Sequence, residues 1–315
     1  MKIIYMGTPE YAVPPLKALV EEGHEVVLCV TQPDKQKGRG KKVMFSPVKE
    51  AAVELGIPVL QPVRVKEEEM VEQLRKLNPE LIVVAAFGQI LSKEILELPK
   101  YGCINIHASI LPKYRGASPI QWTVINGDEE AGVTTMQMDE GIDTGDILLC
   151  RKLVPDEKET YGSLQEKLSI AGAKLIIETV CALENGTLTR TPQDEEASTH
   201  TRMMHKEMGN LDFSKSAQEL ERLIRGLNPW PSAYTHLHEK TLKVWDARVC
   251  TAEELSVSPE QGVPGEIVSV GKQGFAVKTG KDYLLLSEVQ LEGKKRMDCG
   301  AFLRGYQVET GEKCC

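Results

Sequence analysis

A run of seven apolar residues, Leu81 to Phe87, limits the fold of this chain more than any other feature. The run is too short for a membrane helix, which takes about 20 apolar residues. Its unbroken apolar character is typical of a strand that is buried on both faces, as in parallel sheets covered by helices on each side. The run therefore predicts an α/β fold.

Short apolar runs and amphipathic helical patterns alternate on either side of this strand. Several of the helical patterns end at a glycine or at Asn-Pro, which are helix-stop signals. Such alternation predicts a doubly wound, Rossmann-like α/β domain. The expected strands are Lys2–Met6, Glu25–Thr31, Ile57–Leu60, Leu81–Phe87, Ile104–His107 and Val133–Met138, and the expected helices are Tyr11–Glu22, Val48–Leu55 and Met70–Leu77.

The composition changes between Thr187 and Lys206, where Thr, Glu, Asp, Gln and Pro dominate and no periodicity survives. We interpret residues 189–206 as a linker between one domain of residues 1–188 and another of residues 207–315. Ser216 and Glu219 then have capping-box spacing at the start of an amphipathic helix. The β-like runs that follow, separated by Gly and Pro, predict a small barrel; they are Leu242–Val249, Gly265–Val270, Gly274–Thr279 and Tyr283–Val289.

Composition and spacing argue against several classes of protein. The eight cysteines form no Cys-x-x-Cys or zinc-ligand pattern, so we expect reduced thiols in a cytoplasmic protein without a metal. Gly7-Thr8-Pro9 stands where a dinucleotide-binding fold has Gly-x-Gly-x-x-Gly, which argues against an NAD-dependent oxidoreductase. No signal-peptide pattern is present, and we expect no association with a membrane. The net charge of −8 argues against a strongly basic nucleic-acid binder.

Asn105 and His107 stand two residues apart on the expected strand 104–107, so both side chains lie on one face. The strand ends there, because residues 109–112 leave its pattern. Ligands of open α/β sheets bind at the carboxyl ends of the strands. An amide beside an imidazole can hydrogen-bond a carbonyl oxygen that gains negative charge. The competing interpretation is a buried histidine whose hydrogen bonds are satisfied within the fold.

Residues 139–146, Asp-Glu-Gly-Ile-Asp-Thr-Gly-Asp, hold four carboxylates after the last expected strand of the first domain. Their two glycines indicate a turn, and the Asp-x-Asp-x-Asp-Gly order of a calcium loop is absent. The segment is either an acidic surface turn or part of a site. In the second case one aspartate lies beside His107, keeps that ring protonated and orients a water.

The longest insertion lies between the expected strand 25–31 and the expected helix 48–55. Residues 34–49 hold six basic residues and one acidic residue, a local charge of +5. Long structureless loops in compact domains are usually functional or disordered, and a glycine-flanked basic loop can bind a polyanion. The alternative is a flexible, solvated loop.

With these segments the chain resembles the methionyl-tRNA formyltransferase family along essentially its whole length. The shared Asn, His and Asp belong to a wider superfamily of enzymes that use 10-formyltetrahydrofolate, whereas the basic loop and the C-terminal domain belong to the tRNA enzymes. Ile110 replaces a usual Leu, and Phe213 stands where Trp is common. The likeness rests on Gly7-Thr8-Pro9-Glu10, Thr31-Gln32-Pro33-Asp34, Gly38-Arg39-Gly40-Lys41-Lys42, residues 105–112, 115–121 and 137–146, and Asn228-Pro229-Trp230-Pro231.

The resemblance implies transfer of a formyl group from 10-formyltetrahydrofolate to the α-amino group of charged initiator methionyl-tRNA, for translation initiation and without a metal. Asn105, His107 and Asp143 would be the catalytic residues. The resemblance further implies an OB-like C-terminal barrel, and we expect a monomer. Folate would contact Ser109, Ile110, Leu111, Pro112, Phe87, Gly88 and Asp139, and the tRNA would contact Arg39, Lys41 and Lys42.

Two other functions stay open on these residues. A folate-dependent formyltransferase that acts on a small amine, such as glycinamide ribonucleotide or an amino sugar, would share the catalytic set but needs neither the basic loop nor the barrel. A folate- or RNA-binding module without catalysis would not need Asn105, His107 and Asp143. Residues 207–315 carry a net charge of −2, so any RNA surface there must be local, as at Lys294-Lys295-Arg296.

Overall fold

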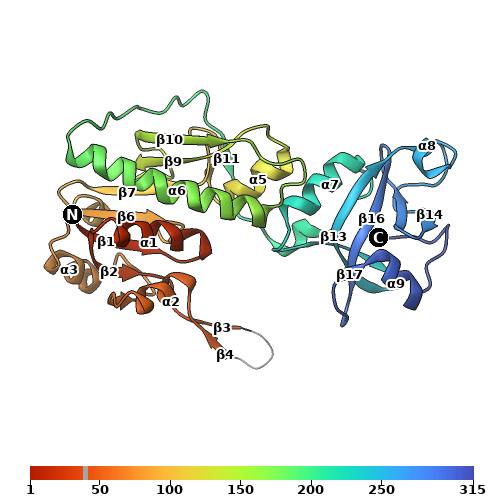
Figure 1. Cartoon of the computed structure of the whole chain (residues 1–315), viewed down its shortest axis with the longest axis horizontal. Helices are drawn as coiled ribbons and strands as arrows, with labels where there is room; N and C mark the ends of the chain where they lie inside the picture. Colours follow the sequence, from red (N-terminus) through yellow and green to blue (C-terminus); the bar gives the residue numbers. More distant parts are fainter. Residues whose placement is uncertain (38–41) are drawn as a thin grey trace. The chain divides into compact units, whose positions relative to one another are not determined.

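The computed structural model describes residues 1–37 and 42–315, which form two compact units (Figure 1). Their sequence ranges interleave. The first unit holds Met1–Pro119, Glu130–Val154 and Gln165–Thr201, and the second holds Ile120–Glu129, Pro155–Leu164 and Arg202–Cys315. Most of the predicted linker 189–206 therefore packs within the first unit. None of the described helices is both long enough and apolar enough to span a membrane.

The first unit is built on a seven-stranded sheet with the order β10-β9-β7-β6-β1-β2-β5. The first five strands in the chain that join this sheet are parallel, and β9 and β10 run antiparallel to their neighbours. The predicted α/β class is confirmed, with a mixed sheet in place of a wholly parallel one. The strands are β1 (Lys2–Gly7), β2 (Glu25–Val30), β5 (Val59–Leu60), β6 (Leu81–Ala85), β7 (Cys103–His107), β9 (Ala131–Gln137) and β10 (Ile147–Leu153).

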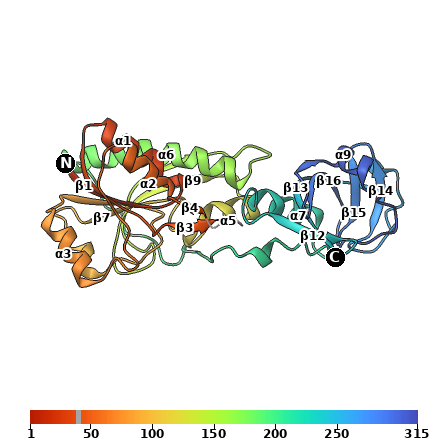
Figure 2. The ribbon, with the colours of Figure 1, turned by 90° about the horizontal axis from the view of Figure 1, so that it is seen from below.

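The apolar run that begins at Leu81 forms β6, between β1 and β7, and all five of its residues are buried. Helices cover both faces of the sheet, as its double-sided burial requires, with α1 and α6 on one face and α3 on the other (Figure 2). The helices of this part of the chain are η1 (Glu10–Ala12), α1 (Val13–Glu21), α2 (Pro47–Glu54), α3 (Glu68–Lys76), α4 (Lys93–Leu96), α5 (Pro119–Asn126) and α6 (Tyr161–Glu184).

A hairpin replaces the structureless loop that the sequence predicted after β2. Strands β3 (Lys35–Lys37) and β4 (Lys42–Met44) pair antiparallel. Lys49 holds the residue that precedes this hairpin, Asp34. Its Nζ donates to Asp34 Oδ2 at 2.5 Å and to Gln61 Oε1 at 2.7 Å. The predicted tRNA contacts Arg39 and Lys41 lie outside the described residues, and Lys42 begins β4.

The second unit is built on a six-stranded antiparallel sheet with the order β12-β13-β16-β15-β14, to which β17 adds beside β16. The predicted capping box is confirmed, since Ser216 and Glu219 cap each other's backbone at the start of α7. The core of the unit is formed by α7, α9 and the sheet. The elements are η2 (Lys206–Gly209), α7 (Ala217–Gly226), β12 (Ala233–Leu237), β13 (Lys240–Cys250), α8 (Ala252–Leu255), β14 (Ile267–Gly271), β15 (Gly274–Lys278), β16 (Tyr283–Leu291), β17 (Met297–Asp298) and α9 (Cys299–Gly305).

Residues 311–315 bridge the outer strands β12 and β14 of this sheet. The backbone N–H of Cys314 donates to the Gly265 carbonyl at 2.8 Å, next to β14. On the other side, His236 of β12 donates to the Cys315 carbonyl at 2.8 Å and accepts from its N–H at 3.2 Å. A sheet whose edges are joined in this way exposes less unpaired backbone, which is the arrangement expected for a small barrel.

Candidate active site

The three residues predicted as the catalytic set lie together in the first unit. Asn105 and His107 stand at the carboxyl end of β7, and Asp143 comes from the turn between β9 and β10. Asn105 Nδ2 donates to Asp143 Oδ1 at 3.3 Å, and His107 Nδ1 lies 3.6 Å from Asp143 Oδ2. Their common partner confirms that Asn105 and His107 share a face of the strand.

Backbone geometry brings the Asp143 turn to β7. Strand β9 pairs antiparallel with β7, so β9 ends beside Ile104, near the amino end of β7. The turn that follows β9 therefore folds back along β7 until Asp143 reaches Asn105 and His107. Asp143 has a φ of 54°, the left-handed conformation that aspartate tolerates better than most residues. Gly145 closes the turn, because a Cβ at this position would lie 1.7 Å from the Gln137 carbonyl oxygen. The acidic segment is thus a tightly folded part of the site.

Strand β8 (Arg115–Gly116) and the residue before it, Tyr114, contact the two members of the His107–Asp143 pair. His107 Nε2 donates to the Tyr114 carbonyl at 2.9 Å, and the Gly116 N–H donates to Asp143 Oδ2 at 2.8 Å. Both ring nitrogens of His107 therefore face acceptors, which a doubly protonated ring satisfies at both positions. The side chains of His107 and Asp143 are only 7% and 15% exposed, so little water screens their interaction.

The buried guanidinium of Arg115 is linked to the Asp143 turn through Gln193. The Arg115 side chain is 1% exposed, and its Nη1 and Nη2 donate to the two carboxylate oxygens of Glu195 at 2.9 and 2.8 Å. Arg115 Nε donates to Gln193 Oε1 at 3.0 Å, and Gln193 Nε2 donates to the Asp143 carbonyl at 2.9 Å. Gln193 and Glu195 were not predicted as site residues, since both lie in the polar segment 189–206 that was expected to be a linker.

The Arg115–Glu195 pair makes stability depend on pH. Hydrogen bonds from Arg115 hold the pKa of the Glu195 carboxyl below its usual range. A carboxyl with a lowered folded-state pKa stabilises the fold above its unfolded pKa of about 4.3, and this stabilisation is lost as the pH falls through the folded value. We therefore expect Glu195→Gln to lower the melting temperature at pH 7 and to approach the wild type as the pH falls toward 3.

Thermal unfolding between pH 7 and pH 3 checks this expectation. Glu196→Gln serves as the control, because Glu196 is an exposed acid one residue away. A gap between Glu195→Gln and the wild type that stays constant over this pH range contradicts the assignment, as does the absence of any gap at pH 7.

The predicted folate turn, residues 109–112, is fixed to β9 by one side chain. Thr134 Oγ1 donates to the Ser109 carbonyl at 2.7 Å and accepts from the Leu111 N–H at 3.3 Å. Ser109 Oγ donates to the Lys113 carbonyl at 2.7 Å, so its hydroxyl is already engaged. Ser109 and Leu111 are buried, whereas Ile110 and Pro112 are half-buried. The turn can therefore offer the side chains of Ile110 and Pro112 to a ligand.

The other predicted folate residues lie on two further turns. The Phe87 side chain belongs to the core of the first unit, and its carbonyl accepts from Thr8 Oγ1 at 3.1 Å. Gly88 is exposed and has a φ of 82°. Asp139 is exposed, and its Oδ1 accepts from the Gly141 N–H at 3.0 Å and from Thr144 Oγ1 at 2.7 Å. The Phe87 carbonyl also accepts from Gln32 Nε2 at 3.2 Å, so both the ring and the carbonyl of Phe87 are engaged within the fold.

Metal ligands were not expected from the sequence. Over the described ranges, 1–37 and 42–315, no group of three or more His, Cys, Asp or Glu side chains is arranged to hold a metal ion.

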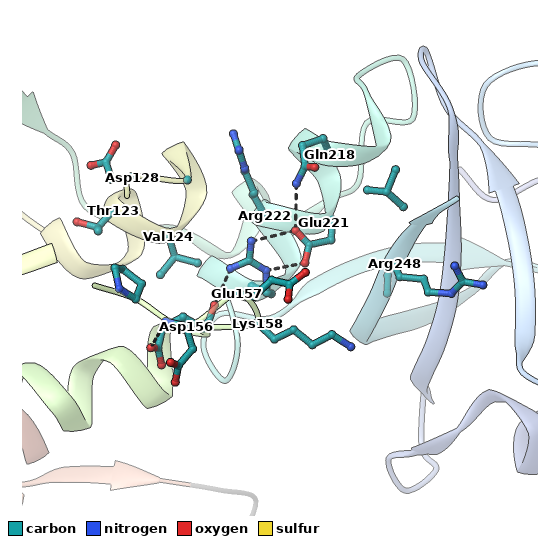
Figure 3. A pocket seen from close by; sticks show the side chains of 16 residues that line it. Thr123, Val124, Asp128, Asp156, Glu157, Lys158, Gln218, Glu221, Arg222 and Arg248 are labelled. Atoms are coloured by element: carbon teal, nitrogen blue, oxygen red, sulfur yellow. Dashed lines mark hydrogen bonds and ion pairs between the residues drawn. The ribbon is translucent and has the colours of Figure 1, made fainter. Parts of the chain in front are cut away.

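A separate cavity of about 460 Å³ lies in the second unit (Figure 3). It is lined by α5, residues 155–159, α7 and β13, and it includes none of the three predicted catalytic residues. Arg225 Nη1 donates to the Glu159 carbonyl at 2.7 Å, and its Nε and Nη2 donate to Glu221 at 2.5 and 3.0 Å. These contacts join α7 to the segment that precedes α6.

Comparison with known proteins adds the family. Residues 1–180 match the family model described as formyl transferase, and residues 203–307 match the one described as formyl transferase, C-terminal domain. The chain is 58% identical over 312 residues to a methionyl-tRNA formyltransferase of Lachnospira eligens, covering 99% of this chain and 98% of the relative. A relative of the same name from Clostridioides difficile is 50% identical over 311 residues, covering 99% of each chain.

A solved structure shows the same fold at low identity. HypX from Aquifex aeolicus, crystallised in complex with tetrahydrofolic acid, superposes with a TM-score of 0.65 at 17% identity. The superposition covers 99% of this chain and 50% of HypX.

Proposed function

This chain belongs to the formyl transferase family and, within it, to the methionyl-tRNA formyltransferases, and we propose that Asn105, His107 and Asp143 carry out its reaction. The enzyme transfers a formyl group from a formyl-folate to methionyl-tRNA. We take the donor to be 10-formyltetrahydrofolate and the acceptor to be charged initiator tRNA. One observation carries the proposed site: a single carboxylate, Asp143, contacts both Asn105 and His107 at the carboxyl end of β7.

The chemistry is an acyl transfer. The neutral α-amine of the methionyl group attacks the formyl carbon and forms a C–N bond, and the formyl oxygen becomes an oxyanion in the tetrahedral intermediate. The bond between the formyl carbon and N10 of the folate then breaks, and the proton lost by the amine is taken up by N10. Stabilisation of the oxyanion is usually the largest single contribution to catalysis in such reactions.

Asn105 is the proposed hydrogen-bond donor to the formyl oxygen. A carboxamide has two N–H groups, and Asp143 takes one of them at 3.3 Å. The second N–H is therefore available for the oxygen that gains charge. The same contact orients the amide, because a carboxylate accepts only from the nitrogen end of Asn105.

His107 acts in this proposal through its charge. Its two ring nitrogens already face the Tyr114 carbonyl and the Asp143 carboxylate. A protonated ring held between these acceptors stabilises a nearby oxyanion without giving up its proton. Asp143 keeps the ring in place and, through a water, accepts a proton from the amine and passes it toward N10.

The folate and the tRNA would each contact a different part of the first unit. We propose that the folate lies against the turn 109–112, Gly88 and Asp139, at the strand edge where ligands of open α/β sheets bind. The acceptor end of the tRNA would meet the hairpin β3–β4. Its segment 34–49 carries +5 within a chain of net charge −8, so the acidic total does not exclude a local contact with RNA. We further propose a monomer that works in the cytoplasm.

Acceptor choice tests the proposed function. With labelled 10-formyltetrahydrofolate, we expect transfer to methionyl initiator tRNA and none to uncharged tRNA or glycinamide ribonucleotide. The full-length relatives that share the name methionyl-tRNA formyltransferase support the tRNA acceptor over a small amine. Transfer to glycinamide ribonucleotide at a comparable kcat/KM would contradict this assignment.

The hairpin gives a separate prediction. Arg39→Ala is expected to raise KM for charged tRNA, with KM for the folate unchanged, and to reduce the slope of log affinity against log salt by about 1, as loss of one phosphate contact does. Steady-state kinetics at several salt concentrations measure both quantities. Lys76→Ala, which removes an exposed cation at the end of α3, is the control. An equal rise in the KM for folate would contradict the role of the hairpin.

A further inference from the structure

The Gln193 side chain makes three hydrogen bonds, two to backbone carbonyls of the Asp143 turn and one to Arg115. Its Nε2 donates to the Asp143 carbonyl at 2.9 Å and to the Gly145 carbonyl at 2.7 Å, and its Oε1 accepts from Arg115 Nε at 3.0 Å. Carbonyl oxygens only accept and the guanidinium only donates, so a single orientation of the amide satisfies all three contacts. Each hydrogen-bonding end of this side chain thus has a defined partner.

The Asp143 turn depends on such support. Asp143 is in the left-handed conformation, with a φ of 54°, which is less favourable than ordinary backbone for a residue with a side chain. Its contacts with Asn105 and His107 are long, at 3.3 and 3.6 Å. A small shift of the turn would therefore separate the carboxylate from both residues, and a misplacement of about 1 Å can cost about 10²-fold in rate.

The supporting contacts form a closed chain. Asp143 is held at its carbonyl by Gln193, which is held by Arg115; the next residue, Gly116, holds the Asp143 carboxylate through its N–H at 2.8 Å. Arg115 is in turn fixed by its bidentate pair with Glu195. The main chain and the side chain of Asp143 are therefore positioned by two consecutive residues of β8.

Backbone hydrogen bonds hold the chain both before and after Gln193. Thr191 exchanges two backbone hydrogen bonds with Ile147, at 2.8 and 2.9 Å, next to the Asp143 turn. Further along, β11 (His200–Thr201) pairs in parallel with β8, and the Arg115 N–H donates to the Thr199 carbonyl at 2.8 Å. Gln193 is thus fixed relative to β10 and β8.

We infer that Gln193 is a positioning residue for formyl transfer, which holds the main chain of Asp143 so that its carboxylate reaches Asn105 and His107. The inference rests on the proposed role of Asp143. It assigns a part in the reaction to Gln193, whose segment, residues 191–201, follows α6 in the chain and belongs to the first unit. Gln193 does not touch the substrates in this account, so its effect belongs to kcat rather than to KM.

Two substitutions separate positioning from simple packing. Gln193→Ala removes all three hydrogen bonds. Gln193→Glu keeps an acceptor for Arg115 but places a carboxylate oxygen against the Asp143 and Gly145 carbonyls, where it cannot donate. We expect kcat to fall about 10- to 10²-fold in both variants, with KM for folate and tRNA within about two-fold of the wild type. Glu196→Ala, an exposed change in the same segment, should keep the wild-type kcat.

Asp143→Asn is assayed alongside these variants, with kcat expressed per folded enzyme from the circular dichroism signal. If Gln193→Ala keeps the wild-type kcat while Asp143→Asn is inactive, the positioning role of Gln193 is overturned and the proposed active site is not. Recovery of kcat in Gln193→Glu but not in Gln193→Ala also overturns this role, because Gln193 would then act only through Arg115. Near wild-type activity in Asp143→Asn overturns the proposed active site itself.

Discussion

Replacing His107 with alanine is expected to lower kcat for formylation of methionyl-tRNA by roughly 10²–10³-fold, the usual cost of removing one oxyanion-stabilising group. The physical reason is the position of the ring, which is 7% exposed and lies between the Tyr114 carbonyl and the Asp143 carboxylate. A charge held there in low-dielectric surroundings needs no reorganisation as the formyl oxygen becomes negative. Alanine leaves the oxyanion with the Asn105 amide alone.

Steady-state kinetics with saturating 10-formyltetrahydrofolate measure this effect. The KM for folate should change little, since no direct contact between His107 and the folate is proposed. His205→Ala removes an exposed histidine and is the matched control. A variant His107→Ala that folds with the wild-type melting temperature and keeps near wild-type kcat would rule out His107 as a catalytic residue.

Asp143→Asn is expected to have a larger effect, about 10³–10⁴-fold in kcat, similar to the loss when the aspartate that orients a catalytic histidine becomes asparagine. The substitution keeps the shape of the side chain and an oxygen that can accept from the Gly116 N–H at 2.8 Å. It removes the negative charge that faces His107, and it removes the group that accepts the proton of the attacking amine. The loss should therefore appear in kcat with little change in melting temperature.

Asp194→Asn provides the control for this change. Asp194 is exposed, lies in the segment that supports the site, and accepts from the Glu196 N–H through one oxygen, which asparagine retains. Wild-type activity in Asp194→Asn and loss in Asp143→Asn are the expected pair of results. Equal, small effects in both would mean that Asp143 is an ordinary surface carboxylate of the acidic turn.

The elements that the sequence predicted well are those whose signal is local. The apolar run from Leu81 predicted the buried strand β6, and the Ser216–Glu219 spacing predicted the start of α7. The pair Asn105 and His107 was placed on one face by the two-residue period of a strand alone. In each case the pattern that predicts the structure lies within a few neighbouring residues, so it can be read without knowing which distant segments pack against it.

Other features depend on partners that are far apart in the sequence. The antiparallel direction of β9 and β10 is set by which strand each pairs with, and the apolar pattern of residues 133–138 does not record direction. The hairpin β3–β4 was predicted as a loop because its strands are three residues long and mostly polar. The joining of β12 to β14 by residues 311–315 likewise rests on backbone hydrogen bonds, which any residue except proline can make.

The site itself was only partly predictable for the same reason. Gln193 reaches the Asp143 carbonyl across 50 residues of sequence, and Arg115 reaches Glu195 across 80. A polar segment without periodicity looks like a linker whether its side chains face water or a buried arginine. The clue that the sequence held was Arg115-Gly116, which belongs to one of the segments shared with the family, although nothing in it indicated the partners of the guanidinium.

The proposed active site requires His107 and Asp143 to act together, and a double-mutant cycle on these two residues tests this most directly. The rate of formyl transfer is measured in a single turnover at saturating substrates. Residues that act as one unit give strongly non-additive effects. We predict that the variant carrying both His107→Ala and Asp143→Asn is no slower than the slower of the two single variants. Rate losses that multiply, so that the double variant is slower by the product of the two single effects, would contradict an active site in which His107 and Asp143 act as one unit.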